Sequence, residues 1–104
     1  MATYEGKLRI LRIDKAPVYW IMFLPYHTGG GAIPRYVSKG KERLRQVLTD
    51  LDIDSFIIDQ ALENLDDKGE SAIDHVVLST DQIRRYGLGE LGVLNSIRTY
   101  IGSL

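Results

Sequence analysis

Apolar and charged residues alternate over residues 4–13 and predict a β-strand. Successive side chains of a strand point to opposite faces of the sheet, so this alternation is typical of a strand that buries one face. The apolar positions change phase near Ile10 and Leu11, which indicates a bulge or a change of face at that point. Residues 14–17 (DKAP) favour a turn. We expect the first strand to leave one exposed edge that is available for pairing.

A second strand is predicted over residues 18–24 (VYWIMFL), which are apolar or aromatic at every position. Such a run, rich in β-forming residues, is typical of a strand with both faces covered. Pro25 ends the run, because proline has no N–H to donate to a sheet. The two strands therefore predict an N-terminal hairpin whose second strand lies at the centre of a sheet. A short extended piece is expected at residues 33–37.

Apolar residues at helical spacing predict two helices in the middle of the chain. The first is expected to be capped by the hydroxyl of Ser38. The second begins at Asp54 or Ser55 and ends near Gly69, with a strand over residues 53–58 as the alternative. The side chains expected in the core are Leu44, Val47, Leu48 and Leu51 of the first helix and Ile57, Ile58, Ala61, Leu62 and Leu65 of the second.

The last third of the chain predicts one strand and two helices. Residues 72–79 (AIDHVVLS) predict a mostly buried strand. Ser79 and Gln82 have the spacing of a capping box, so a short helix is expected over residues 80–86, stopped by the glycine that follows. A last helix is expected over residues 90–101, where apolar residues again recur at helical spacing.

The order of these elements predicts a single α+β domain over residues 1–104. A chain of this length fits one domain with one hydrophobic core. We expect a small, mainly antiparallel sheet, made of the N-terminal hairpin plus a later strand. About four helices are expected to cover this sheet.

Charge is segregated along the chain, although the net charge is only −1. Residues 1–49 carry a charge of +6, residues 50–81 carry −9, and residues 82–104 carry +2. Separation of this kind steers an anionic partner to one end or stacks copies basic end to acidic end. The alternative is that folding brings the two blocks together within one chain and neutralises them.

A glycine-rich stretch followed by cations is the candidate anion site. Consecutive glycines let backbone N–H groups converge on a phosphate or carboxylate, and cations at the start of a helix favour the same ligand. Neither GxxxxGK[ST] nor GxGxxG is complete here, so the alternative is a hinge between the sheet and the helix. The residues of this candidate site are His27, Gly29, Gly30, Gly31, Arg35, Lys39 and Lys41.

A basic segment that overlaps this stretch is the candidate nucleic-acid interface. Its cations suit phosphate binding, and its tyrosine is able to stack on a base. The alternative is the solvated face of an ordinary helix. The residues of the segment are Arg35, Tyr36, Lys39, Lys41, Arg43 and Arg45.

The two histidines are the candidate general acid–base groups. His27 follows the central strand and borders the glycines, a common location for reactive groups. His75 is expected in mid-strand as a hydrogen-bonded structural residue, with Asp74 facing the opposite side of the sheet. No GxSxG, HExxH or paired-carboxylate signature accompanies either histidine. The sequence therefore favours a protein that is not an enzyme, with an enzymatic site at His27 as the alternative.

No metal site or cofactor is predicted. The chain has no cysteine, which excludes disulfides, thiolate catalysis and cysteine-ligated metals. Residues 50–54 (DLDID) begin like a calcium loop, but Ser55 and Ala61 stand where the loop needs glycine and glutamate. The apolar run of residues 16–24 is too short to span a bilayer, so we expect a cytoplasmic protein with no membrane contact.

Together these patterns predict a small non-enzymatic binding or regulatory domain that forms a homo-oligomer or binds a protein partner. One alternative is a nucleic-acid-binding protein that uses the segment from Arg35 to Arg45. The other is a small-molecule or enzymatic anion site at His27 and the glycine-rich loop.

Overall fold

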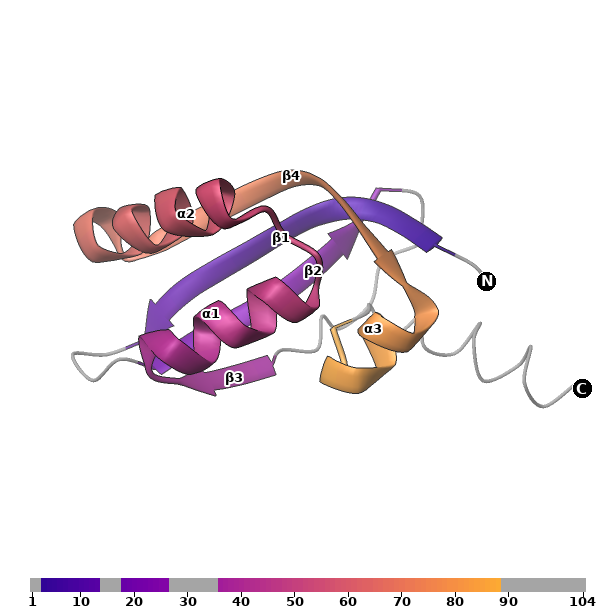
Figure 1. Cartoon of the computed structure of the whole chain (residues 1–104), viewed down its shortest axis with the longest axis horizontal. Helices are drawn as coiled ribbons and strands as arrows, with labels where there is room; N and C mark the ends of the chain where they lie inside the picture. Colours follow the sequence, from indigo (N-terminus) through magenta and orange to yellow (C-terminus); the bar gives the residue numbers. More distant parts are fainter. Residues whose placement is uncertain (1–2, 14–17, 27–35, 89–104) are drawn as a thin grey trace, which may run out of the picture.

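The structure is a computed structural model that describes residues 3–13, 18–26 and 36–88 (Figure 1). The described residues form an α+β fold in which a four-stranded antiparallel sheet packs against three helices. This confirms the predicted fold class, while the helix expected over residues 90–101 lies outside the described residues. The elements are β1 (Thr3–Ile13), β2 (Val18–Pro25), β3 (Tyr36–Lys39), α1 (Lys41–Asp50), α2 (Ser55–Lys68), β4 (Glu70–Ser79) and α3 (Thr80–Tyr86).

The sheet has the strand order β3-β2-β1-β4. β1 and β2 form the predicted hairpin, paired continuously from Gly6 opposite Pro25 to Ile13 opposite Val18. β4 returns antiparallel to β1 on its other side, and β3 pairs with β2. Both hairpin strands are therefore interior. The expectation that the first strand has an exposed edge is wrong, because β4 occupies that edge.

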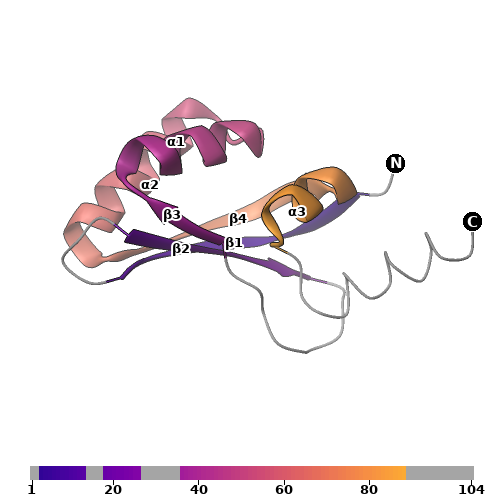
Figure 2. The ribbon, with the colours of Figure 1, turned by 90° about the horizontal axis from the view of Figure 1, so that it is seen from below.

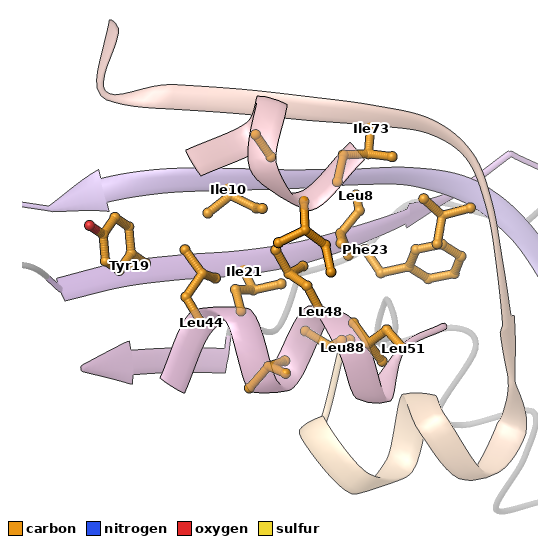
Figure 3. Packing of buried hydrophobic residues seen from close by; sticks show 14 of the residues in the cluster. Leu8, Ile10, Tyr19, Ile21, Phe23, Leu44, Leu48, Leu51, Ile73 and Leu88 are labelled. Carbon is orange, nitrogen blue, oxygen red and sulfur yellow. The ribbon is translucent and has the colours of Figure 1, made fainter. Parts of the chain in front are cut away.

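The three described helices all lie on one side of the sheet, as the edge-on view shows (Figure 2). The core fills the space between them and the sheet, where side chains of the sheet and of the helices point toward one another (Figure 3). Among the helices that the structure describes, none has the length and apolar character needed to cross a membrane. The largest fully buried side chains are Tyr19, Phe23, Leu8, Ile10, Ile21, Leu44, Leu48, Leu51, Ile58, Leu65, Leu78 and Ile83.

Local signals place α2 and α3 where the sequence predicts them. Asp54 caps α2, with its side chain accepting a hydrogen bond from the N–H of Phe56 at 2.8 Å. Ser79 and Gln82 form the predicted reciprocal capping box of α3. The apolar face of α2 is buried as predicted except for Ile57, which is 39% exposed.

The start of α1 differs from the prediction. The residue before the helix is Gly40, and no side chain caps the first turn. Ser38 lies in β3 opposite Tyr19, and its side chain is buried in the core instead of capping the helix. A short third strand therefore takes the position where the sequence predicts a helix start. The apolar stripe predicted for this helix is nonetheless fully buried.

The change of phase in β1 is not a bulge at the predicted position. β1 stays in register with β2 through Ile10 and Leu11. The register changes between Gly6 and Leu8 instead, on the side that pairs with β4. Leu11 is apolar because it belongs to the second face of the sheet, the one without described helices.

Candidate functional site

Most of the predicted anion site lies outside the described residues. This holds for His27, Gly29, Gly30, Gly31 and Arg35. Lys39 is exposed at the end of β3, and Lys41 is exposed at the start of α1. The Nζ atom of Lys41 lies 2.6 Å from Oδ2 of Asp66, a carboxylate of the acidic block.

The cations of α1 contact side chains of the same chain. Arg45 lies 2.9 Å from Asp59 of α2. Arg43 donates to the hydroxyl of Tyr36 at 3.0 Å, and this hydrogen bond is the main cause of the raised pKa of Arg43. Exposed ion pairs contribute little stability. They do show that, in the described part of the chain, the basic and acidic blocks partly neutralise each other, which weakens the case for a nucleic-acid interface on α1.

A polar network joins α3 to the end of α1. The carboxylate of Asp50 accepts hydrogen bonds from the hydroxyl of Tyr86 and, at 2.6 Å, from Arg85. These two hydrogen bonds lower the pKa of Asp50, and the one from Tyr86 has the larger effect. The side-chain amide of Gln82 donates to the backbone oxygen of Asp50 and to Asp52. Each of these groups has a partner that fixes one helix to another, so we interpret the network as structural.

The face of the sheet opposite the helices carries a row of apolar side chains, which we call the open face. In each strand the buried side chains alternate with side chains of this face. No helix within the described ranges covers it (Figure 2). Its apolar residues are Leu11, Ile13, Val18, Trp20, Met22, Leu24, Val37 and Val77, and its charged residues are Glu5, Lys7, Arg9, Lys39, Glu70 and Asp74.

The open face is apolar along β2, one of its two central strands, and carries charges of opposite sign at its two edges, while the other central strand, β1, adds the cations Lys7 and Arg9. Cross-strand pairs align Val37 with Trp20 and Trp20 with Leu11 in the middle of the face. Lys39 lies on the β3 edge, whereas the β4 edge carries Glu70, paired with Arg9 at 3.9 Å. The apolar residues at every position of β2 were the sequence signal for this face. The sequence predicts a strand covered on both faces, whereas the described helices cover one face only.

A β-bulge places a polar cluster at one end of the open face. Gly6 pairs with Val76 but Leu8 pairs with Ile73, so β4 holds one extra residue between these pairs. His75 in this bulge has a φ angle of 57°. Both Asp74 and His75 are consequently exposed. His75 lies in mid-strand and its ring is hydrogen-bonded, as expected, but the bulge breaks the regular alternation that was expected to place Asp74 on the opposite side of the sheet.

Two further side chains complete the cluster, Glu5 of the neighbouring strand β1 and Tyr26, which directly follows β2. The hydroxyl of Tyr26 accepts the N–H of His75 at 3.1 Å, and it donates to Oδ1 of Asp74 at 3.2 Å. The Tyr26 hydroxyl thereby accepts the backbone N–H of His75, which the bulge removes from the hydrogen bonds of the sheet. Nδ1 of His75 lies 3.0 Å from Oε1 of Glu5.

The hydrogen bonds of the cluster involve both its histidine and its tyrosine. The imidazole of His75 is largely exposed, and the hydrogen bond with Glu5 is the main cause of its raised pKa. The hydroxyl of Tyr26 already accepts the N–H of His75 and donates to Asp74. In the described part of the cluster, no free nucleophile therefore adjoins the histidine. Within the residues that the structure describes, no three His, Cys, Asp or Glu side chains gather as metal ligands do.

Replacing Glu5 by glutamine is expected to lower the pKa of His75 toward its ordinary value of about 6.5. A raised pKa in the folded state stabilises the protein fully below about pH 6.5, and this contribution is lost as the pH rises through the raised value. The variant should therefore lose more stability at about pH 5.5 than at about pH 8.5. Titration of the His75 ring followed by NMR measures the pKa directly.

Glu70→Gln is the matched control, because Glu70 lies at the other end of β4, where its carboxylate contacts Arg9. This control should leave the pKa of His75 unchanged. An unchanged pKa in Glu5→Gln would show that the contact between Glu5 and His75 is not formed in solution.

Similarity to known proteins assigns no family to this chain. No protein-family model matches it, and no curated protein or solved structure is significantly similar to it. The evidence on function is therefore the geometry, burial and charge of the residues described above.

Proposed function

We propose that this protein is a small binding domain, not an enzyme, and that it self-associates by packing the open face of its sheet against that of a second copy. One observation carries the proposal: all described helices cover one face of the sheet, and the other face is apolar along β2. Sheets with an apolar face pack on one another about 10 Å apart. Removing such a face from water is the main driving force of association.

The charges of the open face suit a second copy of the same chain. A two-fold axis parallel to the strands would place β3 of one copy over β4 of the other. Lys39 pairs with Val18, and Val18 pairs with Ile13, so these three residues form one row across the sheet. Glu70 lies in the row of Leu11, which is two residues from Ile13. In this arrangement Lys39 of each copy meets the acidic edge of the other, and the contact repeats by symmetry.

The size of the face sets the expected affinity. β2 has eight residues, so the face is about 26 Å long, and four strands make it about 19 Å wide. Its projected area of about 500 Å² is below the roughly 800 Å² per partner of a standard interface. We therefore expect a dimer that dissociates in the micromolar range.

Sedimentation velocity from about 1 to about 200 µM protein tests the proposal. We expect a monomer–dimer equilibrium that Val37→Glu weakens about tenfold or more, because a glutamate on β3 would lose its hydration in the interface and, in the two-fold arrangement, would face Glu70 of the second copy. Val37 is 49% exposed, so the variant should still fold.

Phe56→Glu is the control, because Phe56 is also exposed, at 67%, but belongs to α2 on the other side of the sheet. It should dimerise like the unmodified protein. A monomer at every concentration, or equal dimerisation of both variants, would exclude the open face as the interface.

A further inference from the structure

A groove of about 300 Å³ lies apart from the centre of the open face, between the α1–α2 connection and β4. It is lined by residues 51–54 and Ile57 on one side and by residues 73–77 of β4 on the other. This volume is at the lower end of the range for ligand pockets, about 300–1,000 Å³. The groove therefore suits one or two large side chains better than a whole cofactor.

Two exposed apolar side chains of α2 lie at or beside this groove. Among the described residues, five large apolar side chains are exposed, and two of them, Phe56 at 67% and Ile57 at 39%, belong to the first turn of α2. Ile57 lines the groove, and Ile53 adds a partly buried side chain. Val77 of β4 also borders the groove, but its pairing with Glu5 places its side chain on the open face. A concentration of exposed apolar side chains is typical of an interaction site.

The strand that forms one wall of the groove is an edge strand. β4 pairs with β1 on one side, and no described strand lies on the other. With ten residues it is a long edge. The outer backbone N–H and C=O groups of such an edge are available to an added strand.

The charges around the groove favour a cationic ligand. Three of its lining residues are aspartates: Asp52, Asp54 and Asp74. One oxygen of each carboxylate has a partner. Asp52 accepts a hydrogen bond from Gln82, and Asp54 accepts one from the N–H of Phe56. Asp74 accepts one from Tyr26 and forms an ion pair with Lys7. Within the described residues, the second oxygen of each makes no hydrogen bond. Together they set a negative potential beside the apolar wall.

We infer that this groove binds an extended peptide segment of a partner protein, in which a lysine or arginine lies two residues from a large apolar side chain, so that both point to the same face of the added strand. The segment adds as a strand to the outer edge of β4. Its apolar side chain enters the groove against Ile57, and its cation pairs with Asp52 and Asp54. The α1–α2 connection and Ile57 lie on the helix side of the sheet, away from the proposed dimer interface, whereas Asp74 of the groove also borders the open face.

Fluorescence polarisation with synthetic peptides on the full chain tests this inference. The probe is a labelled ten-residue peptide that repeats Val-Thr-Lys-Thr, so that valine and lysine share one face of the added strand, and the matched peptide has glutamate in place of each lysine. We expect the lysine peptide to bind about tenfold more tightly than the glutamate peptide. A third peptide, N-methylated on alternate residues along the edge that faces β4, should bind about tenfold more weakly, because it lacks the N–H groups of strand addition.

Two variants locate the binding site. Ile57→Ser removes the apolar wall, and Asp52→Asn removes a charge while keeping the size of the side chain and its contact with Gln82. Each should weaken binding of the lysine peptide about fivefold or more, the second most strongly at low salt. Circular dichroism verifies that both variants fold.

Val37→Glu, which disrupts the proposed dimer interface, should leave peptide binding unchanged. This keeps the result distinct from the outcome of the dimer experiment. Equal binding of the N-methylated peptide would exclude strand addition, and unchanged binding in Ile57→Ser would exclude the groove. Either result would overturn the inference.

Discussion

Replacing Gly6 by alanine is expected to lower the free energy of unfolding by about 3 kcal/mol. A Cβ atom at this position would lie 2.4 Å from the backbone oxygen of Leu24 and 2.8 Å from Cα of Pro25. Both atoms belong to the backbone of β2, so no side-chain rotation relieves the overlap. Gly6 pairs with both neighbouring strands, and separating them would disturb the hairpin and the register with β4. Urea denaturation followed by circular dichroism measures the loss.

Gly87→Ala is the matched control for this prediction. Gly87 has a φ angle of 59°, which an alanine adopts with strain, but no atom lies within 4 Å of the added Cβ. This variant should lose only about 1 kcal/mol. If Gly6→Ala loses no more than the control, the close approach of β1 and β2 at this position is wrong.

Replacing Phe23 by alanine is expected to lower the free energy of unfolding by about 4 kcal/mol. Phe23 has no exposed surface and lies among the side chains of the core between the sheet and the helices (Figure 3). Removing its ring leaves a cavity that the surrounding side chains fill only in part. Denaturation at low protein concentration measures the loss in the monomer.

Met22→Ala tests the opposite face of the same strand. Met22 neighbours Phe23 but belongs to the open face, where it is only partly buried. Its replacement should lower the free energy of unfolding of the monomer by less than about 1 kcal/mol. Equal losses in the two variants would show that β2 is buried on both faces of the monomer, as the sequence had suggested.

The boundaries of the later elements were predictable because their signals are local. The capping box of α3 joins Ser79 and Gln82, three residues apart, and the cap of α2 joins Asp54 to Phe56. The apolar stripe of α1 follows from the helical repeat alone. In each case the interacting residues lie within a few positions of one another, so their order along the chain is sufficient evidence.

The functional surfaces were harder to predict because they depend on distant residues. The candidate groove joins residues 51–57 to residues 73–77 across the edge of the sheet. His75 is exposed because a bulge forms against Gly6, almost seventy residues earlier in the chain. The cluster around His75 also needs Glu5 and Tyr26, which no short motif connects to it.

Local propensity along this chain determines where most of the described helices and strands lie, and it determines their α+β class. It does not determine which face of β2 the helices cover, since both faces carry apolar residues. It also does not determine that the cations of α1 meet the acids of α2. These outcomes depend on how the strands order themselves and on which side of the sheet the helices pack. The free energy that decides between such arrangements comes from burial and pairing of residues far apart in the chain, which short-range patterns do not contain.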